Sequence, residues 1–142
     1  MGSLADLILA ESSDAPAIAA SEYPLGTFKG INVDGLDPLR LAALHSIFTE
    51  VEFKDLLEHY KPIAEASTSG PWLIKLPGEL IAFLAGLAPQ DYTSAATKWV
   101  STVQAQEEGL SVMEAEKFLG QVGHFAQVAA FEKKEVYLWV YS

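Results

Sequence analysis

The chain has 142 residues, half of them hydrophobic, and 19 acidic residues against 9 basic ones. This length and composition exclude a disordered chain and indicate one globular domain over residues 1–142. A formal net charge of −10, without any cluster of basic residues, excludes nucleic-acid binding and electrostatic attraction to an anionic membrane, because both need a positively charged surface.

The chain contains no cysteine, which excludes disulfides, thiolate nucleophiles and cysteine metal sites and suits a reducing cytoplasm. No apolar run approaches the roughly 20 residues that a membrane-spanning helix needs. We therefore expect a cytoplasmic protein. Residues 1–3 resemble an expression scar and are left out of the argument.

Short strands and a larger number of helices are predicted in chain order. A first strand is predicted at 4–10, although its Ala and Leu content leaves helix open, and a strand or extended loop is predicted at 27–33. Strands are also expected at 71–76 and 136–141, and helices at 15–21, 37–49, 51–60, 77–87, 92–109 and 111–131. An α+β fold follows, in which a predominantly helical single domain packs on a small sheet.

The helix that begins after Asp37 has the clearest local signals. Asp37 suits an N-cap and Pro38 suits the first turn, where its missing N–H costs nothing. Its apolar stripe, at helical spacing, consists of Leu41, Leu44, His45 and Phe48. The stripe places one histidine among apolar side chains.

Two further segments carry strong local signals. Ser111 and Glu114 form a capping-box pattern at the start of the last helix, and Gly109 suits the end of the helix before it. Gly120 and Gly123 weaken the last helix, so a close approach of a neighbouring backbone is expected there. The strand at 136–141 is apolar on both faces, which predicts a place inside the sheet.

His45 is the only candidate catalytic residue, and two interpretations compete for it. In one, the imidazole is sealed in the core and anchors its helix to a carbonyl or carboxylate. In the other, it lines a pocket and acts as a general base. His59 and His124 do not stand at metal-ligand spacing from it, and no nucleophile motif is present, so we predict no metal site and no cofactor.

The candidate binding residues are Trp72, Glu50 and Glu52. Trp72 follows the most loop-like segment of the chain and is the preferred exposed aromatic anchor. Glu50 and Glu52 belong to the solvated acids near helix ends, which suit a basic partner.

Several segments resemble an uncharacterised family of bacterial proteins over most of the chain. The segments are 23–28, 35–38 with Leu44-His45-Ser46, 70–72, 76–77 and 137–139. More distantly, Leu36-Asp37, Leu44-His45 and Thr49 resemble one helix of the YfbM-like proteins. Both resemblances imply a shared fold, and neither supplies an activity.

The sequence thus predicts a small acidic bacterial protein that binds the basic surface of another protein. An immunity protein that inhibits a toxin is the concrete example of this class. Two other classes stay open. One is an enzyme or small-ligand pocket centred on His45. The other is a structural subunit that forms a homodimer through the strand from Val136.

Overall fold

A computed structural model of the chain describes residues 4–65, 67–68 and 70–141. The possible expression scar at residues 1–3 lies outside the described residues. In the described part, the strands form one antiparallel sheet in the order β2-β1-β5-β4-β3. Their bounds are Leu4–Ala10 for β1, Lys29–Asn32 for β2, Ala64–Glu65 for β3, Trp72–Lys75 for β4 and Glu135–Tyr141 for β5.

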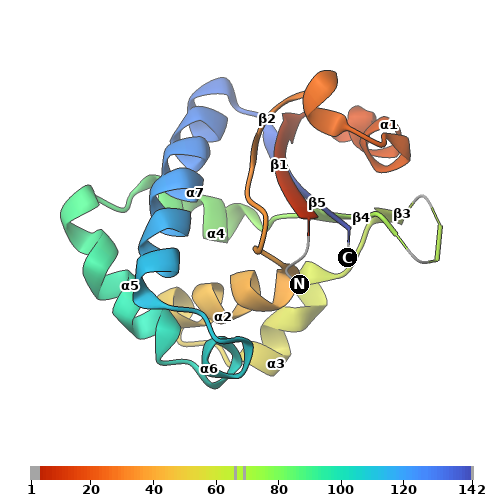
Figure 1. Cartoon of the computed structure of the whole chain (residues 1–142). Helices are drawn as coiled ribbons and strands as arrows, with labels where there is room; N and C mark the ends of the chain where they lie inside the picture. The colour runs from red at the N-terminus through yellow and green to blue at the C-terminus, as the bar shows by residue number, and fades with distance from the viewer. Residues whose placement is uncertain (1–3, 66, 69, 142) are drawn as a thin grey trace.

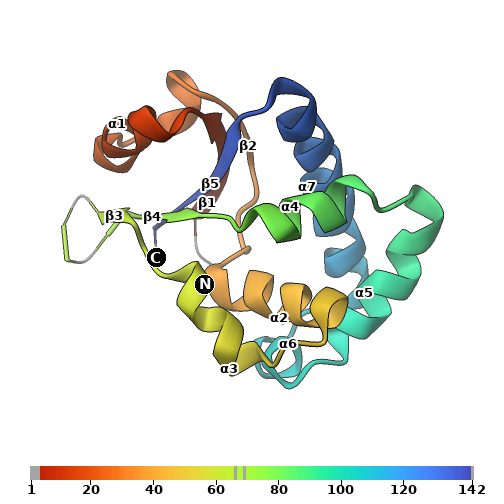
Figure 2. The same cartoon turned by 180° about the vertical axis from the view of Figure 1, so that it is seen from behind.

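Helices cover the two faces of this sheet unequally. One face carries the long helix α7 (Val112–Glu132) together with α2 (Pro38–Thr49), α4 (Gly78–Ala85) and α5 (Tyr92–Val100). Beyond them lie α3 (Phe53–Leu56), η3 (Leu57–Tyr60), η4 (Pro89–Asp91) and α6 (Val103–Glu108). The other face carries α1 (Ala15–Ala20) and the short turns η1 (Ser12–Asp14) and η2 (Pro24–Gly26) (Figures 1 and 2). The predicted α+β class is therefore confirmed.

The buried side chains divide into two clusters, one on each face. The larger cluster joins Leu7, Leu138 and Ile74 of the sheet to the helical layer. The smaller one joins Ile8, Leu73 and Trp139, which point the other way because side chains alternate along a strand, to Ile18 of α1.

The caps predicted at Asp37, Gly109 and Ser111 agree with the structure. The Asp37 carboxylate accepts a hydrogen bond from the Arg40 N–H at 2.7 Å, and Ser111 and Glu114 form the capping box of α7. Gly109 ends α6 in the left-handed conformation, with φ of 73°. These signals were readable because each depends on a few neighbouring residues.

Two predicted helices are broken in the structure. The helix predicted at 51–60 is one turn of α-helix continued as the 3₁₀ turn η3. The helix predicted at 92–109 divides into α5 and α6 because Thr102 adopts an extended conformation and caps α6, accepting from the Ala105 N–H. Hydroxyl side chains that bond the nearby backbone compete with helix continuation.

Strand β5 lies at the centre of the sheet, between β1 and β4. This confirms the prediction from its two apolar faces. It also corrects the idea that the strand from Val136 could pair with a second copy, because both of its edges are already hydrogen-bonded within the chain.

Candidate functional site

His45 lies in the middle of α2 and is only 1% exposed. Its Nδ1 is 2.9 Å from the hydroxyl oxygen of Tyr60, at the end of η3, and the two rings meet edge to face. Its Nε2 faces the carboxylate of Glu79, in the first turn of α4, at 3.6 Å. The prediction that the imidazole is sealed is confirmed, but only Nδ1 has a hydrogen-bond partner among the described residues, because the Glu79 carboxylate lies too far from Nε2 for a hydrogen bond.

The two neighbours favour one tautomer of the ring. Burial raises the pKa of Tyr60 far above its ordinary value, so its hydroxyl keeps its proton and can donate to Nδ1. The proton of the neutral imidazole then sits on Nε2, toward the Glu79 carboxylate; the opposite tautomer would set a lone pair against a negative charge.

Burial also lowers the pKa of His45, and the nearby Glu79 carboxylate opposes that effect in part. Two charges of opposite sign would gain from their attraction, but taking an imidazolium out of water costs more here. His45 is therefore a neutral group that ties α2 to η3 and α4. A substrate could reach it only after the helical layer opened.

The other histidines do not complete a metal centre. His59 lies near enough to His45 to lower its pKa, whereas His124 is exposed on α7. Within the part of the chain that the structure describes, no group of three histidine or acidic side chains is placed to hold a metal ion.

Glu50 and Glu52 come together on an open groove of about 440 Å³ where α2 ends and α3 begins. Both are exposed, and Glu50 holds a left-handed conformation with φ of 60° at the end of α2. Half-buried Phe53 and exposed Val51 supply the apolar part of the groove, which Gln104 of α6 also borders. The lining thus combines carboxylates with an apolar strip.

Trp72 differs from the expected exposed anchor. It is half-buried in β4, packs against the larger core cluster, and its ring covers Gly70. The loop before it suggested exposure, but the sheet register turns its side chain toward the helical layer together with that of Val140. Its role in the structure is packing.

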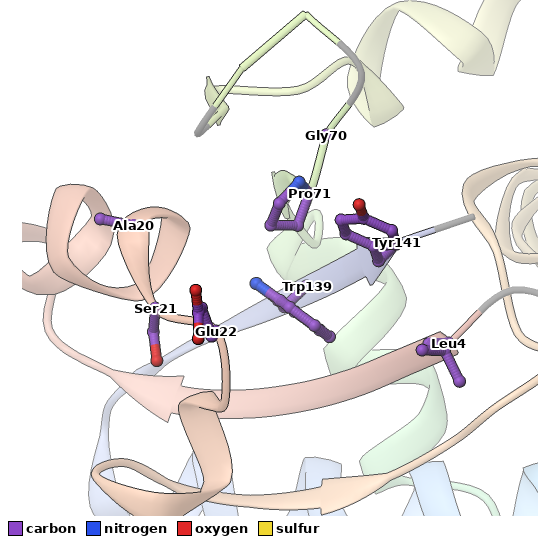
Figure 3. Close-up of a pocket in the computed structure, with 8 residues that line it drawn as sticks. All are labelled: Leu4, Ala20, Ser21, Glu22, Gly70, Pro71, Trp139 and Tyr141. Atoms are coloured by element: carbon purple, nitrogen blue, oxygen red, sulfur yellow. The ribbon is translucent and has the colours of Figure 1, made fainter.

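The cavity of most interest lies on the other face of the sheet and was missed by sequence reasoning. It measures about 500 Å³ and is bordered by the end of α1, the Gly70-Pro71 turn and the sheet. Trp139, with 7% exposure, lines it, and no acceptor among the described residues lies within hydrogen-bonding distance of its indole nitrogen. Figure 3 shows this nitrogen pointing to the side that Ser21 and Glu22 border.

Asp6, a second residue missed from the sequence, is directly opposite Trp139 in the β1–β5 register and only 5% exposed. Its carboxylate accepts a hydrogen bond from the Asn32 side chain at 3.0 Å. Burial raises its pKa, and the nearby Asp34 adds to that effect. The apolar residues on both sides of Asp6 in β1 were the sequence signal that it would be buried.

Comparison of the chain with protein-family models, with curated protein sequences and with solved structures found no match. The resemblances drawn from the sequence therefore stay predictions. Among the described residues, no helix is both long and apolar enough to cross a membrane.

Proposed function

We propose that this chain is a non-enzymatic binding module that holds a basic segment of a partner protein in the groove bordered by Glu50 and Glu52. An immunity protein that masks the basic surface of a toxin is the kind of protein that we have in mind. The observation that carries the proposal is the meeting of two exposed carboxylates and an apolar strip in one groove.

The charges around the groove support a cationic partner. A net charge of −10 attracts basic proteins over several ångströms and speeds their encounter. Among the described residues that line the groove, the one cation is Lys54; it is 3.6 Å from Glu52, and both side chains are more than 70% exposed. Such exposed ion pairs contribute only about 0–1 kcal/mol, so a lysine or arginine of the partner can replace Lys54 at little cost.

The apolar strip supports a protein partner over a free cation. Val51 is 43% exposed and lies between the two carboxylates in the chain. A partner segment that carries basic side chains beside an apolar one would satisfy both parts of the lining, and burial of the apolar part adds affinity that salt does not screen.

A charge-matched pair of variants tests the proposal. The double variant Glu50→Gln/Glu52→Gln and the control Glu65→Gln/Glu116→Gln each remove two negative charges, and the control residues do not line the groove. The immobilised wild type and both variants are exposed to lysate of the source cell. We expect a partner that the wild type and the control retain and the groove variant loses, with retention falling as salt rises.

A partner held equally by both double variants would contradict the groove as the binding site. Retention that ignores salt would contradict the electrostatic basis of the proposal. The folding of each variant is checked by its thermal unfolding. Glu50, Glu52 and Glu65 are exposed and Glu116 is half-buried on α7, so we expect all four substitutions to be tolerated.

A further inference from the structure

The cavity at Trp139 is a second site that is independent of the groove. We propose that it binds a small organic cation, one with an apolar body and a hydrogen-bond acceptor. The cavity of about 500 Å³ is within the usual size range of small-molecule sites, and it lies on the opposite face of the sheet from the helical layer.

The acceptor is required by the indole nitrogen of Trp139. This N–H is closed off from solvent and has no acceptor among the described residues, although Trp139 lines the cavity. An unpaired buried N–H of this kind lowers stability, and buried polar groups in folded proteins nearly always have a partner. A ligand oxygen that reaches the nitrogen would remove that cost. The exposed side chain of Glu22 borders the same end of the cavity (Figure 3).

The positive charge is indicated by the lining. Trp139 and Tyr141 project from the same face of β5, with ring centroids 6.5 Å apart and ring planes 28° from parallel. Aromatic faces attract organic cations. Glu22 adds a carboxylate at the rim, and no lysine, arginine or histidine is among the described residues that line the cavity. An anion would find no counter-charge there.

The apolar body is indicated by the remaining walls. Leu4, Ala20 and Pro71 surround the two aromatic rings, so a ligand without apolar surface would leave these walls unused. Buried Asp6 is opposite Trp139 in the sheet register but is not among the residues that line the cavity. The lining thus combines aromatic rings, a donor and one acidic side chain.

Three probes of matched shape separate these requirements. Acetylcholine carries both the positive charge and a carbonyl acceptor. Its uncharged analogue 3,3-dimethylbutyl acetate keeps only the acceptor, and pentyltrimethylammonium keeps only the charge. Each is titrated into the whole chain while the indole N–H signals of the three tryptophans are followed by nuclear magnetic resonance, the Trp139 signal being the one that Trp139→Phe removes.

We expect acetylcholine to shift the Trp139 indole signal in a saturable way. The uncharged ester should bind about tenfold more weakly, because it lacks the cation–π attraction. Pentyltrimethylammonium should bind but shift the indole signal much less, because it has no oxygen that accepts the indole N–H of Trp139. Glu22→Gln should weaken acetylcholine about tenfold, because it removes the coulombic attraction of the carboxylate for the ammonium group, whereas Glu107→Gln, on α6 in the other layer, should leave its affinity unchanged.

An indole signal that acetylcholine leaves unshifted at millimolar concentration would overturn the proposal. So would equal binding of the uncharged ester, or an equal effect of the two glutamate variants. If Trp139→Phe does not fold, the Trp139 signal is assigned from the wild type, and the three probes with the two glutamate variants still decide the outcome. These results do not depend on the groove at Glu50, so a failure of one site leaves the other testable.

Discussion

The two faces of the sheet differ most clearly in the hydrogen bonding of a buried tryptophan side chain. In the helical layer, the indole nitrogen of Trp99 donates to the Arg40 carbonyl at 3.0 Å, and the side chain is fully buried. On the other face, the Trp139 nitrogen has no acceptor among the described residues and its ring lines a cavity. Among the described residues, the helical layer also leaves two buried polar atoms without a hydrogen-bond partner, His45 Nε2 and Gln121 Oε1. The contrast therefore concerns the two tryptophans: Trp99 is enclosed by helices, whereas one short helix and two turns leave a cavity at Trp139.

The difference extends to the charged groups of each face. Arg40, the only arginine in the chain, donates to the Glu108 carboxylate at 2.7 Å and to the Gly35 carbonyl at 2.8 Å. It therefore joins α2 to α6 and to the turn before α2. The opposite face instead buries Asp6, whose carboxylate accepts a hydrogen bond from one side-chain amide, that of Asn32 on β2. Arg40 thus joins separate elements of the helical layer, whereas Asp6 is paired within the sheet.

The largest expected effect comes from the same substitution on each face. Trp99→Phe should lower the free energy of unfolding by about 2–4 kcal/mol, because it leaves a void in a closed core and removes the hydrogen bond from the indole N–H to the Arg40 carbonyl. Trp139→Phe should change it by less than about 1 kcal/mol, because the lost N–H had no acceptor among the described residues. Urea unfolding of both variants measures the difference.

Equal losses for the two tryptophan variants would contradict the contrast between the faces. They would mean that the Trp139 nitrogen has a partner in solution that offsets its burial. The far-ultraviolet circular dichroism spectrum of each variant provides the check that the fold is retained.

The buried titratable group of the helical layer should give stability a pH dependence of known sign. Burial lowers the pKa of His45 below its ordinary 6.5, so the unfolded chain binds a proton that the folded chain resists. The stability that this provides is present above pH 6.5 and falls as the pH decreases through the histidine range. His45→Gln should flatten the curve between about pH 7 and pH 5.

His124→Gln, an exposed substitution on α7, is the control and should leave the slope of the wild type in place. A slope that survives in His45→Gln would assign it to another group. Thermal unfolding in buffers of constant ionic strength measures both variants.

Asp6 should show the opposite sign on the other face. Burial raises its pKa, so the folded chain binds this proton more tightly than the unfolded chain does. The free energy of unfolding therefore decreases as the pH rises through the pKa of the folded state. Asp6→Asn, which keeps an acceptor for Asn32, should therefore be more stable than the wild type at pH 7. Its advantage should shrink as the pH falls toward 4.

An Asp6→Asn variant that is less stable than the wild type at pH 7 would show that the carboxylate charge is needed on this face. Glu107→Gln, an exposed acid in the other layer, is the control for a general loss of negative charge. Urea unfolding at pH 7 and pH 4 gives the comparison.

The features that could be predicted from the sequence are local or periodic. Asp37, Ser111 and Gly109 mark helix ends through contacts within a few residues. The two apolar faces of β5 predicted its central place, because only a strand covered on both sides gains from them. The apolar stripe of α2 likewise predicted that His45 would be buried.

The features that were missed depend on residues far apart in the chain. Glu79 meets His45 although the two residues lie on separate helices far apart in the chain, and no spacing rule links them. Trp139 reads as an ordinary core aromatic, and only the packing of α1 and the Gly70-Pro71 turn around it leaves a cavity. Trp72 was misjudged for a related reason, since the direction of its side chain depends on the register with β5.

The smallest expected effect tests how tightly the helical layer is packed. A Cβ at Gly120 would meet its nearest neighbour, Tyr92, at 3.9 Å, which is ordinary contact. Gly120→Ala should therefore stabilise the protein by about 0.5–1 kcal/mol through helix propensity. At Gly123, one turn further along α7, the same atom would lie 3.3 Å from the Tyr92 hydroxyl oxygen and 3.5 Å from the Leu84 carbonyl oxygen. Gly123→Ala should gain less or lose stability, because the neighbouring groups have to move. Urea unfolding measures both alanine variants. Equal gains would show that Tyr92 and the Leu84 carbonyl move at no cost, and that the helical layer is packed less tightly at Gly123 than these distances indicate.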